Sequence, residues 1–174
     1  MATKVLSNDF MQHIATEEAW KELSQDFNWS ETMLEKFQDK VDWNEISSNS
    51  KICWTVPMIQ KFKNRIQWDS FSENNGLSIT ESIIETFKDK WNWHKLSANT
   101  NVTMSYELLD KYADLWDWNE IIDRYGYNVL FDNHGIEFYE RYKDRIPAAK
   151  VQNSSLWREI VSQRKVLLLE EIKA

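Results

Sequence analysis

The feature that most constrains this chain is a tryptophan that recurs every 25 residues, at Trp43, Trp68, Trp93 and Trp118. We call these four residues the marker tryptophans. An aromatic residue lies six positions before each of them, at Phe37, Phe62, Phe87 and Tyr112. A fixed period of this length is typical of repeat proteins, in which each repeat buries its apolar face by packing against the next one. The sequence therefore predicts a stack of similar repeats, with the marker indoles as interior packing groups rather than stacking platforms for bases or sugars.

A serine or threonine lies thirteen positions before each marker and before Trp20, which precedes Trp43 by 23 residues. These residues are Ser7, Ser30, Thr55, Thr80 and Ser105. Their hydroxyl groups can accept hydrogen bonds from the first free amides of a helix, so they are predicted N-caps. Apolar residues three, four and seven positions later lie on one face of a helix of about three turns. An Asp, Asn or Gln directly before each marker predicts a second, shorter helix.

An asparagine follows each of the first three markers at a distance of six residues, at Asn49, Asn74 and Asn99. Asparagine suits a left-handed C-terminal helix cap. We also expect the three amides to form a ladder that satisfies backbone groups of neighbouring repeats, a role that we favour over ligand binding.

These patterns predict an all-α fold, namely an α-solenoid of about six two-helix repeats of 25 residues with a C-terminal capping helix. With three glycines and two prolines, the chain has too few turn-forming residues for a β-sandwich or barrel. We expect one domain over 1–174, with regular repeats over 1–121, an irregular last repeat with an insertion over 122–153, and the capping helix over 154–174. The buried side of that helix is predicted at Trp157, Ile160, Val161, Leu168 and Ile172.

Charge and cysteine content limit the environment and the partners. The net charge of -7 disfavours non-specific binding to a nucleic acid backbone. The single cysteine, Cys53, fits a reducing compartment. The stretch Met1–Phe10 lacks the apolar run of a signal peptide, and Val166–Leu169 is too short to span a membrane. A cytoplasmic location is expected.

Two phrases of the sequence contain paired tryptophans: Trp91-Asn92-Trp93-His94-Lys95-Leu96-Ser97-Ala98-Asn99 and Trp116-Asp117-Trp118-Asn119. They resemble the Trp-rich "WNW" or "WDW" repeats of giant-virus proteins and of some bacterial and phage proteins. The resemblance covers about residues 20–121, and only two copies keep both tryptophans. It implies a repeat scaffold and supplies no catalytic residues.

Motifs for catalysis or metal binding are missing from the sequence. There is no P-loop, no GxGxxG and no GxSxG motif. The three histidines, His13, His94 and His134, are far apart in sequence and belong to no HExxH motif. We therefore expect no enzyme, no cofactor and no metal site; the alternative, an unrecognised hydrolase, would be tested by changing His94 and His134.

The favoured function is non-enzymatic binding of another protein, in the manner of a phage or mobile-element inhibitor or an immunity protein. The first two positions after the markers recur in register along one edge, and aromatic insertion loops often bind partners. The predicted partner-binding residues are Asn44, Glu45, Asp69, His94, Lys95, Asn119, Glu120, Tyr125, Tyr127, Phe131 and His134.

A ridge of cations is the basis of the alternative function, binding of RNA or DNA. Its residues gather toward the C-terminal halves of the longer helices, at Lys36, Lys61, Lys63, Arg65, Lys88 and Lys90. The simpler explanation is complementation of helix dipoles, and interspersed acidic residues weaken the alternative. Trp29 and Trp54 fall outside the marker column, and the sequence leaves open whether they are core or surface residues.

Overall fold

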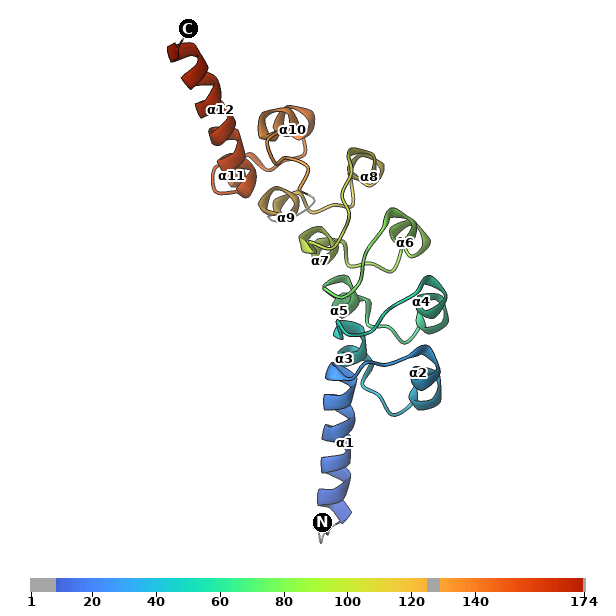
Figure 1. Cartoon of the computed structure of the whole chain (residues 1–174). Coiled ribbons are helices and arrows are strands. Elements are labelled where there is room, and N and C mark those ends of the chain that lie inside the picture. Colours follow the sequence, from blue (N-terminus) through green and yellow to red (C-terminus); the bar gives the residue numbers. More distant parts are fainter. Residues whose placement is uncertain (1–8, 125–128, 174) are drawn as a thin grey trace. The chain divides into compact units, whose positions relative to one another are not determined.

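The computed structural model describes residues 9–124 and 129–173. Within these ranges all regular secondary structure is helical, and the one β-type contact is an isolated bridge between Ile79 and Val102. The prediction of an all-α protein is confirmed (Figure 1). The helices are α1 (Asp9–Asp26), α2 (Glu31–Phe37), α3 (Trp43–Ser48), α4 (Val56–Phe62), α5 (Trp68–Ser72), α6 (Glu81–Thr86), α7 (Trp93–Ala98), α8 (Tyr106–Lys111), α9 (Trp118–Asp123), α10 (Gly135–Tyr142), α11 (Ala148–Val151) and α12 (Ser155–Lys173).

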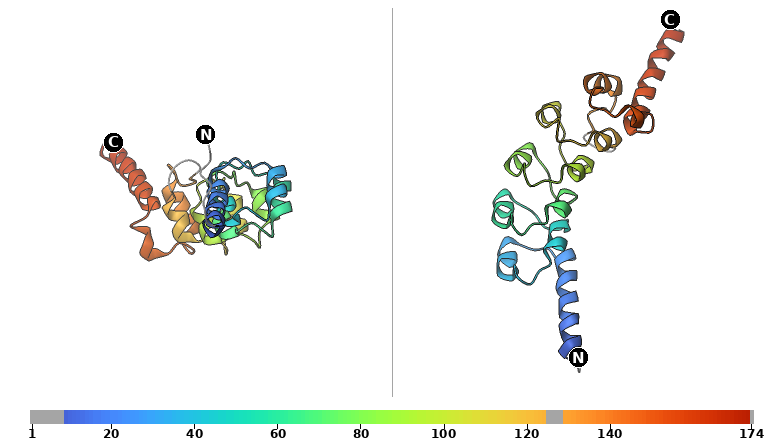
Figure 2. Two further views of the ribbon diagram at one scale, coloured as in Figure 1. Left: turned by 90° about the horizontal axis from the view of Figure 1, so that it is seen from below. Right: turned by 180° about the vertical axis from the view of Figure 1, so that it is seen from behind.

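Residue contacts divide the chain into two compact units, Met1–Leu77 (unit 1) and Ser78–Ala174 (unit 2). In unit 1, α3 packs beside both α1 and α5, while α2 and α4 lie side by side in a second row (Figures 1 and 2). In unit 2, α9 packs beside both α7 and α12, while α6, α8 and α10 follow one another in a second row. Each unit therefore contains two rows of helices, between which the chain alternates.

The predicted hydroxyl caps begin three of the helices of the second rows. The N–H groups of Met33 and Met58 donate to the hydroxyls of Ser30 and Thr55, both at 3.3 Å, and Leu108 N–H donates to Ser105 at 3.1 Å. Thr80 stands before α6 without a side-chain capping bond, and Ser7 lies outside the described residues. These helices contain six to eight residues, so the expectation of three turns was wrong.

The marker tryptophans help to end these helices. Their indole N–H groups each donate to a backbone carbonyl five residues earlier, at or just beyond the helix end: Trp43 to Gln38 at 2.8 Å, Trp68 to Lys63 at 2.9 Å, Trp93 to Lys88 at 3.3 Å and Trp118 to Ala113 at 2.9 Å. The last carbonyls of a helix have no partner within the helix, so an outside donor stabilises an early stop.

The interior position predicted for the marker indoles is only partly right. Trp118 is buried, but the other three are half-buried. The residues two positions earlier are the fully packed ones, at Val41, Ile66, Trp91 and Trp116. Trp29 and Trp54, which the sequence left open, are also buried. The marker rings instead contact the aromatic column of the following repeat, with centroid distances of 5.2 Å for Trp43–Phe62, 5.2 Å for Trp93–Tyr112 and 4.9 Å for Trp118–Tyr142.

Both long helices differ from prediction. The helix α1 runs without a break through Trp20, because Ala19 stands where the other repeats have a polar cap residue that can begin a new helix. The bounds of α12 agree with the predicted capping helix, but its predicted buried side was only partly right: Trp157 and Ile160 are half-buried, whereas Val161, Leu168 and Ile172 are exposed. With 19 residues, α12 is far longer than α10, which has eight and packs against it, so much of its length is left uncovered.

Buried serines join consecutive copies of the repeat. The hydroxyls of Ser24, Ser47 and Ser97 accept the backbone N–H groups of Asp42, Gln67 and Asp117, each at 2.9 Å. Each hydroxyl also donates to the carbonyl of the tryptophan four residues earlier. Because each side chain bonds both its own helix and the start of the next repeat's short helix, the serine column fixes the distance between repeats.

The predicted ladder of asparagine amides is confirmed within unit 1. Asn49 Nδ2 donates to the carbonyls of Ser24 and Phe27, at 2.8 and 2.9 Å, and its Oδ1 accepts the N–H of Lys51 at 2.8 Å. Asn74 repeats this pattern one copy later. The expected left-handed cap was wrong, because Asn49 is extended, with φ -66° and ψ 108°. Its amide satisfies carbonyls of the preceding repeat instead.

Arg124 occupies the asparagine position of the last regular copy and is buried. Its Nη1 donates to the carbonyls of Ser97 and Asn99 at 3.0 and 2.8 Å, and its Nη2 donates to Val102 at 3.2 Å. Burial lowers the pKa of Arg124 to about 10, so the guanidinium is still charged at neutral pH.

Candidate binding surfaces

The predicted edge of polar residues is present on the short helices. Asn44, Asp69, His94 and Asn119 are exposed, whereas Glu45, Lys95 and Glu120 are half-buried. In unit 1, Asn44 Oδ1 accepts the hydroxyl hydrogen of Ser70 at 2.6 Å, and Glu45 pairs with Lys21 at 3.7 Å. These residues thus form contacts within and between repeats, and the edge of unit 1 combines a neutral hydrogen bond at Asn44 with charged side chains at Glu45 and Asp69.

The corresponding place in unit 2 holds three groups that can bind a cation. His94 Nδ1 lies 2.7 Å from Asp117 Oδ2, and one ligand atom from each of His94, Asp117 and Glu120 lies within 4.8 Å of the others. The hydrogen bond to Asp117 raises the pKa of His94. Burial opposes ionisation of Asp117, but the bonds from His94 and Asn119 outweigh it and lower the pKa of Asp117. We call these three residues the His94 cluster.

His94 and Glu120 were predicted binding residues, whereas Asp117 was predicted only as a helix cap. The 25-residue period could have indicated Asp117. A side chain one position after a marker lies near the residues one position before and two positions after the next marker. In unit 1, Asn44 contacts Ser70 in this way.

The insertion before α10 is only partly a surface feature. Tyr125 and Tyr127 lie outside the described residues. Phe131 is buried and packs edge-on against Phe138 at a centroid distance of 5.3 Å, so its predicted role in partner binding was wrong. It fills the core beneath α10 instead. His134 is exposed, and its Nδ1 lies 3.7 Å from Glu137.

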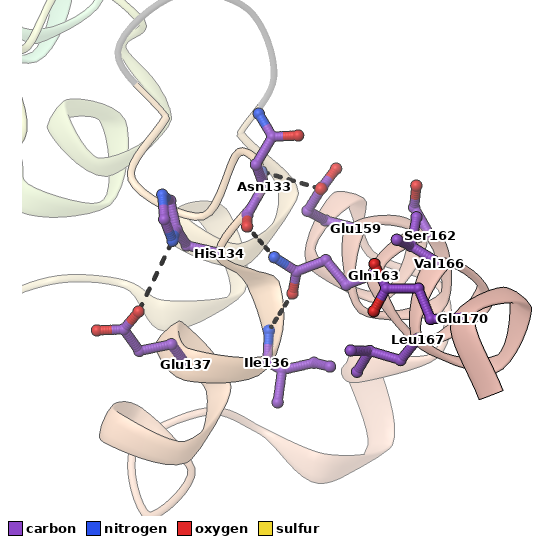
Figure 3. A pocket seen from close by; sticks show the side chains of 10 residues that line it. All are labelled: Asn133, His134, Ile136, Glu137, Glu159, Ser162, Gln163, Val166, Leu167 and Glu170. Carbon is purple, nitrogen blue, oxygen red and sulfur yellow. Dashed lines mark hydrogen bonds and ion pairs between the residues drawn. The ribbon is translucent and has the colours of Figure 1, made fainter. Parts of the chain in front are cut away.

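A groove of about 540 Å³ lies between α10 and α12 (Figure 3). Two backbone amides hold its walls together, since Asn133 N–H donates to Glu159 and Ile136 N–H donates to Gln163, both at 2.9 Å. Gly135 permits this close approach, because a Cβ atom there would lie 2.9 Å from the backbone nitrogen of Ile160. The groove is therefore held by hydrogen bonds from the backbone at the start of α10 to side chains of α12, with the two backbones close together at Gly135.

The groove combines apolar and acidic side chains. Its apolar lining comes from Ile136, Val166 and Leu167, and Figure 3 shows Glu137, Glu159 and Glu170 around it. His134 is the one lining residue able to carry positive charge among those that the structure describes. Val166 and Leu167 are exposed although they are large and apolar. The groove therefore has the surface chemistry of a binding site for a group that is both apolar and basic.

Two of the six residues of the predicted cationic ridge pair with carboxylates. Lys61 pairs with Glu31 and Glu35 of the preceding repeat at 2.9 and 3.0 Å, and Arg65 pairs with Asp39 at 2.6 Å. Lys36 and Lys88 lie over the rings of Phe37 and Tyr112, at 5.2 and 5.6 Å. The same pairing recurs in unit 2, where Lys111 bonds Glu81 and Glu85. Lys63 and Lys90 flank this row, half-buried and exposed respectively.

Comparison of the chain with protein-family models, with curated protein sequences and with solved structures gave no match. The resemblance to Trp-rich repeats therefore stays a prediction. Among the described residues, no helix has both the length and the apolar character needed to cross a membrane.

Proposed function

We propose that this chain is a non-enzymatic α-solenoid protein that binds another protein, and that the groove between α10 and α12 receives a basic amphipathic helix of that partner. Three contacts that recur from one repeat to the next support the solenoid arrangement: the serine column, the asparagine ladder and the stacking of marker rings. The groove, with its apolar lining and acidic rim, is the observation that carries the proposed function.

An amphipathic helix matches this groove in both shape and charge. Helices that bind in grooves insert apolar side chains spaced three and four residues apart. Ile136, Val166 and Leu167 offer the complementary apolar surface, and the glutamates favour lysine or arginine at its border. The net charge of -7 adds a long-range attraction for a basic partner.

Nucleic acid is a less suitable partner than protein. A nucleic acid backbone needs cations that are available for phosphate groups. Here two cations of the predicted ridge, Lys61 and Arg65, bond carboxylates of the preceding repeat. The groove between α10 and α12 has an acidic rim, which repels phosphate.

The experiment is a selection of helical peptides from a displayed library, with the intact chain as bait. We expect the selected peptides to be amphipathic and basic. Leu167→Asp should weaken their binding at least about tenfold, since it places a charge on the apolar floor. The matched control is Leu168→Asp on the same helix: the two leucines are 42% and 43% exposed, but only Leu167 lines the groove.

Two outcomes would contradict this function. One is a set of selected peptides without basic residues or an apolar face. The other is equal binding to the Leu167→Asp and Leu168→Asp variants, which would move the binding surface away from the groove. Circular dichroism of both variants checks that the helices are retained.

A further inference from the structure

We propose that His94, Asp117 and Glu120 form a binding site for a divalent transition-metal ion of the zinc class. The site joins α7 to α9 and is independent of the proposed groove, which lies between α10 and α12. One imidazole and two carboxylates are a donor set that zinc accepts, with solvent in the fourth position.

The ligand atoms are already close to one another. The three donor atoms lie within 4.8 Å, and His94 Nδ1 is 2.7 Å from Asp117 Oδ2. Ligands at ~2.0–2.2 Å from a tetrahedral zinc ion lie roughly 3.3 Å apart. His94 Nδ1 and Asp117 Oδ2 therefore need to separate by about 0.6 Å and Glu120 to move inward. Because the His94 side chain is exposed, rotation of side chains provides this adjustment.

The orientation of Asp117 is fixed in advance. Its Oδ1 accepts the backbone N–H and the side-chain amide of Asn119, both at 2.9 Å, so its Oδ2 faces His94. The backbone N–H of Asp117 in turn donates to the buried hydroxyl of Ser97 at 2.9 Å. Hydrogen bonds of this kind hold metal ligands in position and raise metal affinity. The repeat scaffold thus orients one of the three proposed ligands.

Unit 1 supplies two internal comparisons for the same three positions. In the later copy the corresponding residues are Asn44, Gln67 and Ser70, and Asn44 bonds Ser70 directly at 2.6 Å, so packing of the repeats needs neither a histidine nor a carboxylate there. In the earlier copy they are Lys21, Asp42 and Glu45, and Lys21 pairs with Glu45 at 3.7 Å. A protonated lysine has no lone pair for a metal, whereas an imidazole has one. The set in unit 2 therefore differs from both in that all three of its side chains can ligate a metal.

The test is isothermal titration of the full chain with Zn²⁺ in a buffer that contains Mg²⁺, after treatment with a chelator. The expected result is one bound Zn²⁺ per chain. His94→Asn, Asp117→Asn and Glu120→Gln should each weaken binding at least about tenfold. These variants are designed to fold: Asn occupies the position of His94 in unit 1, and Asn92 already caps α7 as Asp117 caps α9.

The control is His13→Asn, which removes an exposed histidine of α1 and should leave Zn²⁺ binding unchanged. NMR supplies a second measurement, because the ring signals of His94 should shift on addition of Zn²⁺ while those of His13 do not. The proposal is overturned if the wild-type chain takes up no Zn²⁺. It is also overturned if His94→Asn binds as tightly as the wild type, or if His13→Asn abolishes binding.

Discussion

Asn74 and Ser47 are joined by a hydrogen bond of 2.8 Å from the side-chain Nδ2 to the backbone carbonyl, across 27 residues of sequence. The second amide hydrogen of Asn74 bonds the carbonyl of Asn49 at 3.2 Å. Asn74 is buried, so the protein offers these carbonyls no solvent-exposed alternative to its amide.

Asn74→Ala should therefore lower the free energy of unfolding by about 2–4 kcal/mol, because two buried carbonyls lose their donor. Urea denaturation followed by circular dichroism measures this change. Asn64→Ala, at an exposed position of the same unit, should have little effect. If the two variants are equally stable, the ladder contributes nothing to the stability of unit 1.

Gly76 meets the backbone of the preceding repeat. A Cβ atom at this position would lie 2.1 Å from the Ser50 carbonyl oxygen, which the backbone cannot avoid without moving. Gly76→Ala should cost about 2 kcal/mol or more in unfolding free energy. Lys51→Ala, at the matching position of the earlier repeat, should change stability little. Thermal unfolding of the two variants measures this difference in stability.

Two substitutions of Trp68 separate the contribution of its indole hydrogen bond to stability from that of its ring packing. Trp68→Phe keeps an aromatic ring beside Phe71 but loses the bond to the Lys63 carbonyl, and should cost about 1 kcal/mol. Trp68→Ala also loses the ring and should cost about 3 kcal/mol. Chemical denaturation gives both values. Equal losses would mean that the ring packing is unimportant.

Much of the fold follows from local signals in the sequence. The hydroxyls of Ser30, Thr55 and Ser105 begin helices as predicted, because an N-cap depends on residues only three positions away. The break expected before Trp20 failed for an equally local reason, since Ala19 cannot cap a helix.

Contacts between repeats were harder to predict. The indole of Trp43 looked apolar in sequence, yet its N–H group caps a helix end and the ring is only partly buried. The His94 cluster needed the exact register of two repeats, because its members come from positions 23 and 26 residues apart. Periodicity identifies which residues correspond to one another, but not which corresponding residues touch.

Arg124 satisfies three carbonyls with a buried charge. Arg124→Met should cost about 3 kcal/mol, because Ser97, Asn99 and Val102 all lose a donor. Arg124→Asn restores the amide of the other repeats, which reaches the equivalents of Ser97 and Asn99, and should cost only about 1 kcal/mol. Urea denaturation gives the stabilities of the two variants. A methionine variant more stable than the asparagine variant would contradict this prediction.

The pair of His94 and Asp117 should make stability depend on pH when metal is removed with a chelator. The bond to Asp117 raises the pKa of His94 above 6.5, so its stabilising effect is complete below that value and is lost as pH rises through the raised pKa. NMR titration should give a lower pKa for His94 in Asp117→Asn. His94→Asn should flatten this part of the pH profile of thermal unfolding; an unchanged His94 pKa would contradict the pairing.

The arginine at position 124 changes what the last regular copy requires of the chain that follows it. An amide both donates and accepts, and Asn49 and Asn74 use their acceptor to hold the N–H group two residues later. A guanidinium has no acceptor, so Arg124 bonds the carbonyls of the copy before it but cannot supply that second bond. The link from α9 to α10 is thus freed from the local constraint that the asparagine imposes, which fits its greater length than the link from α7 to α8.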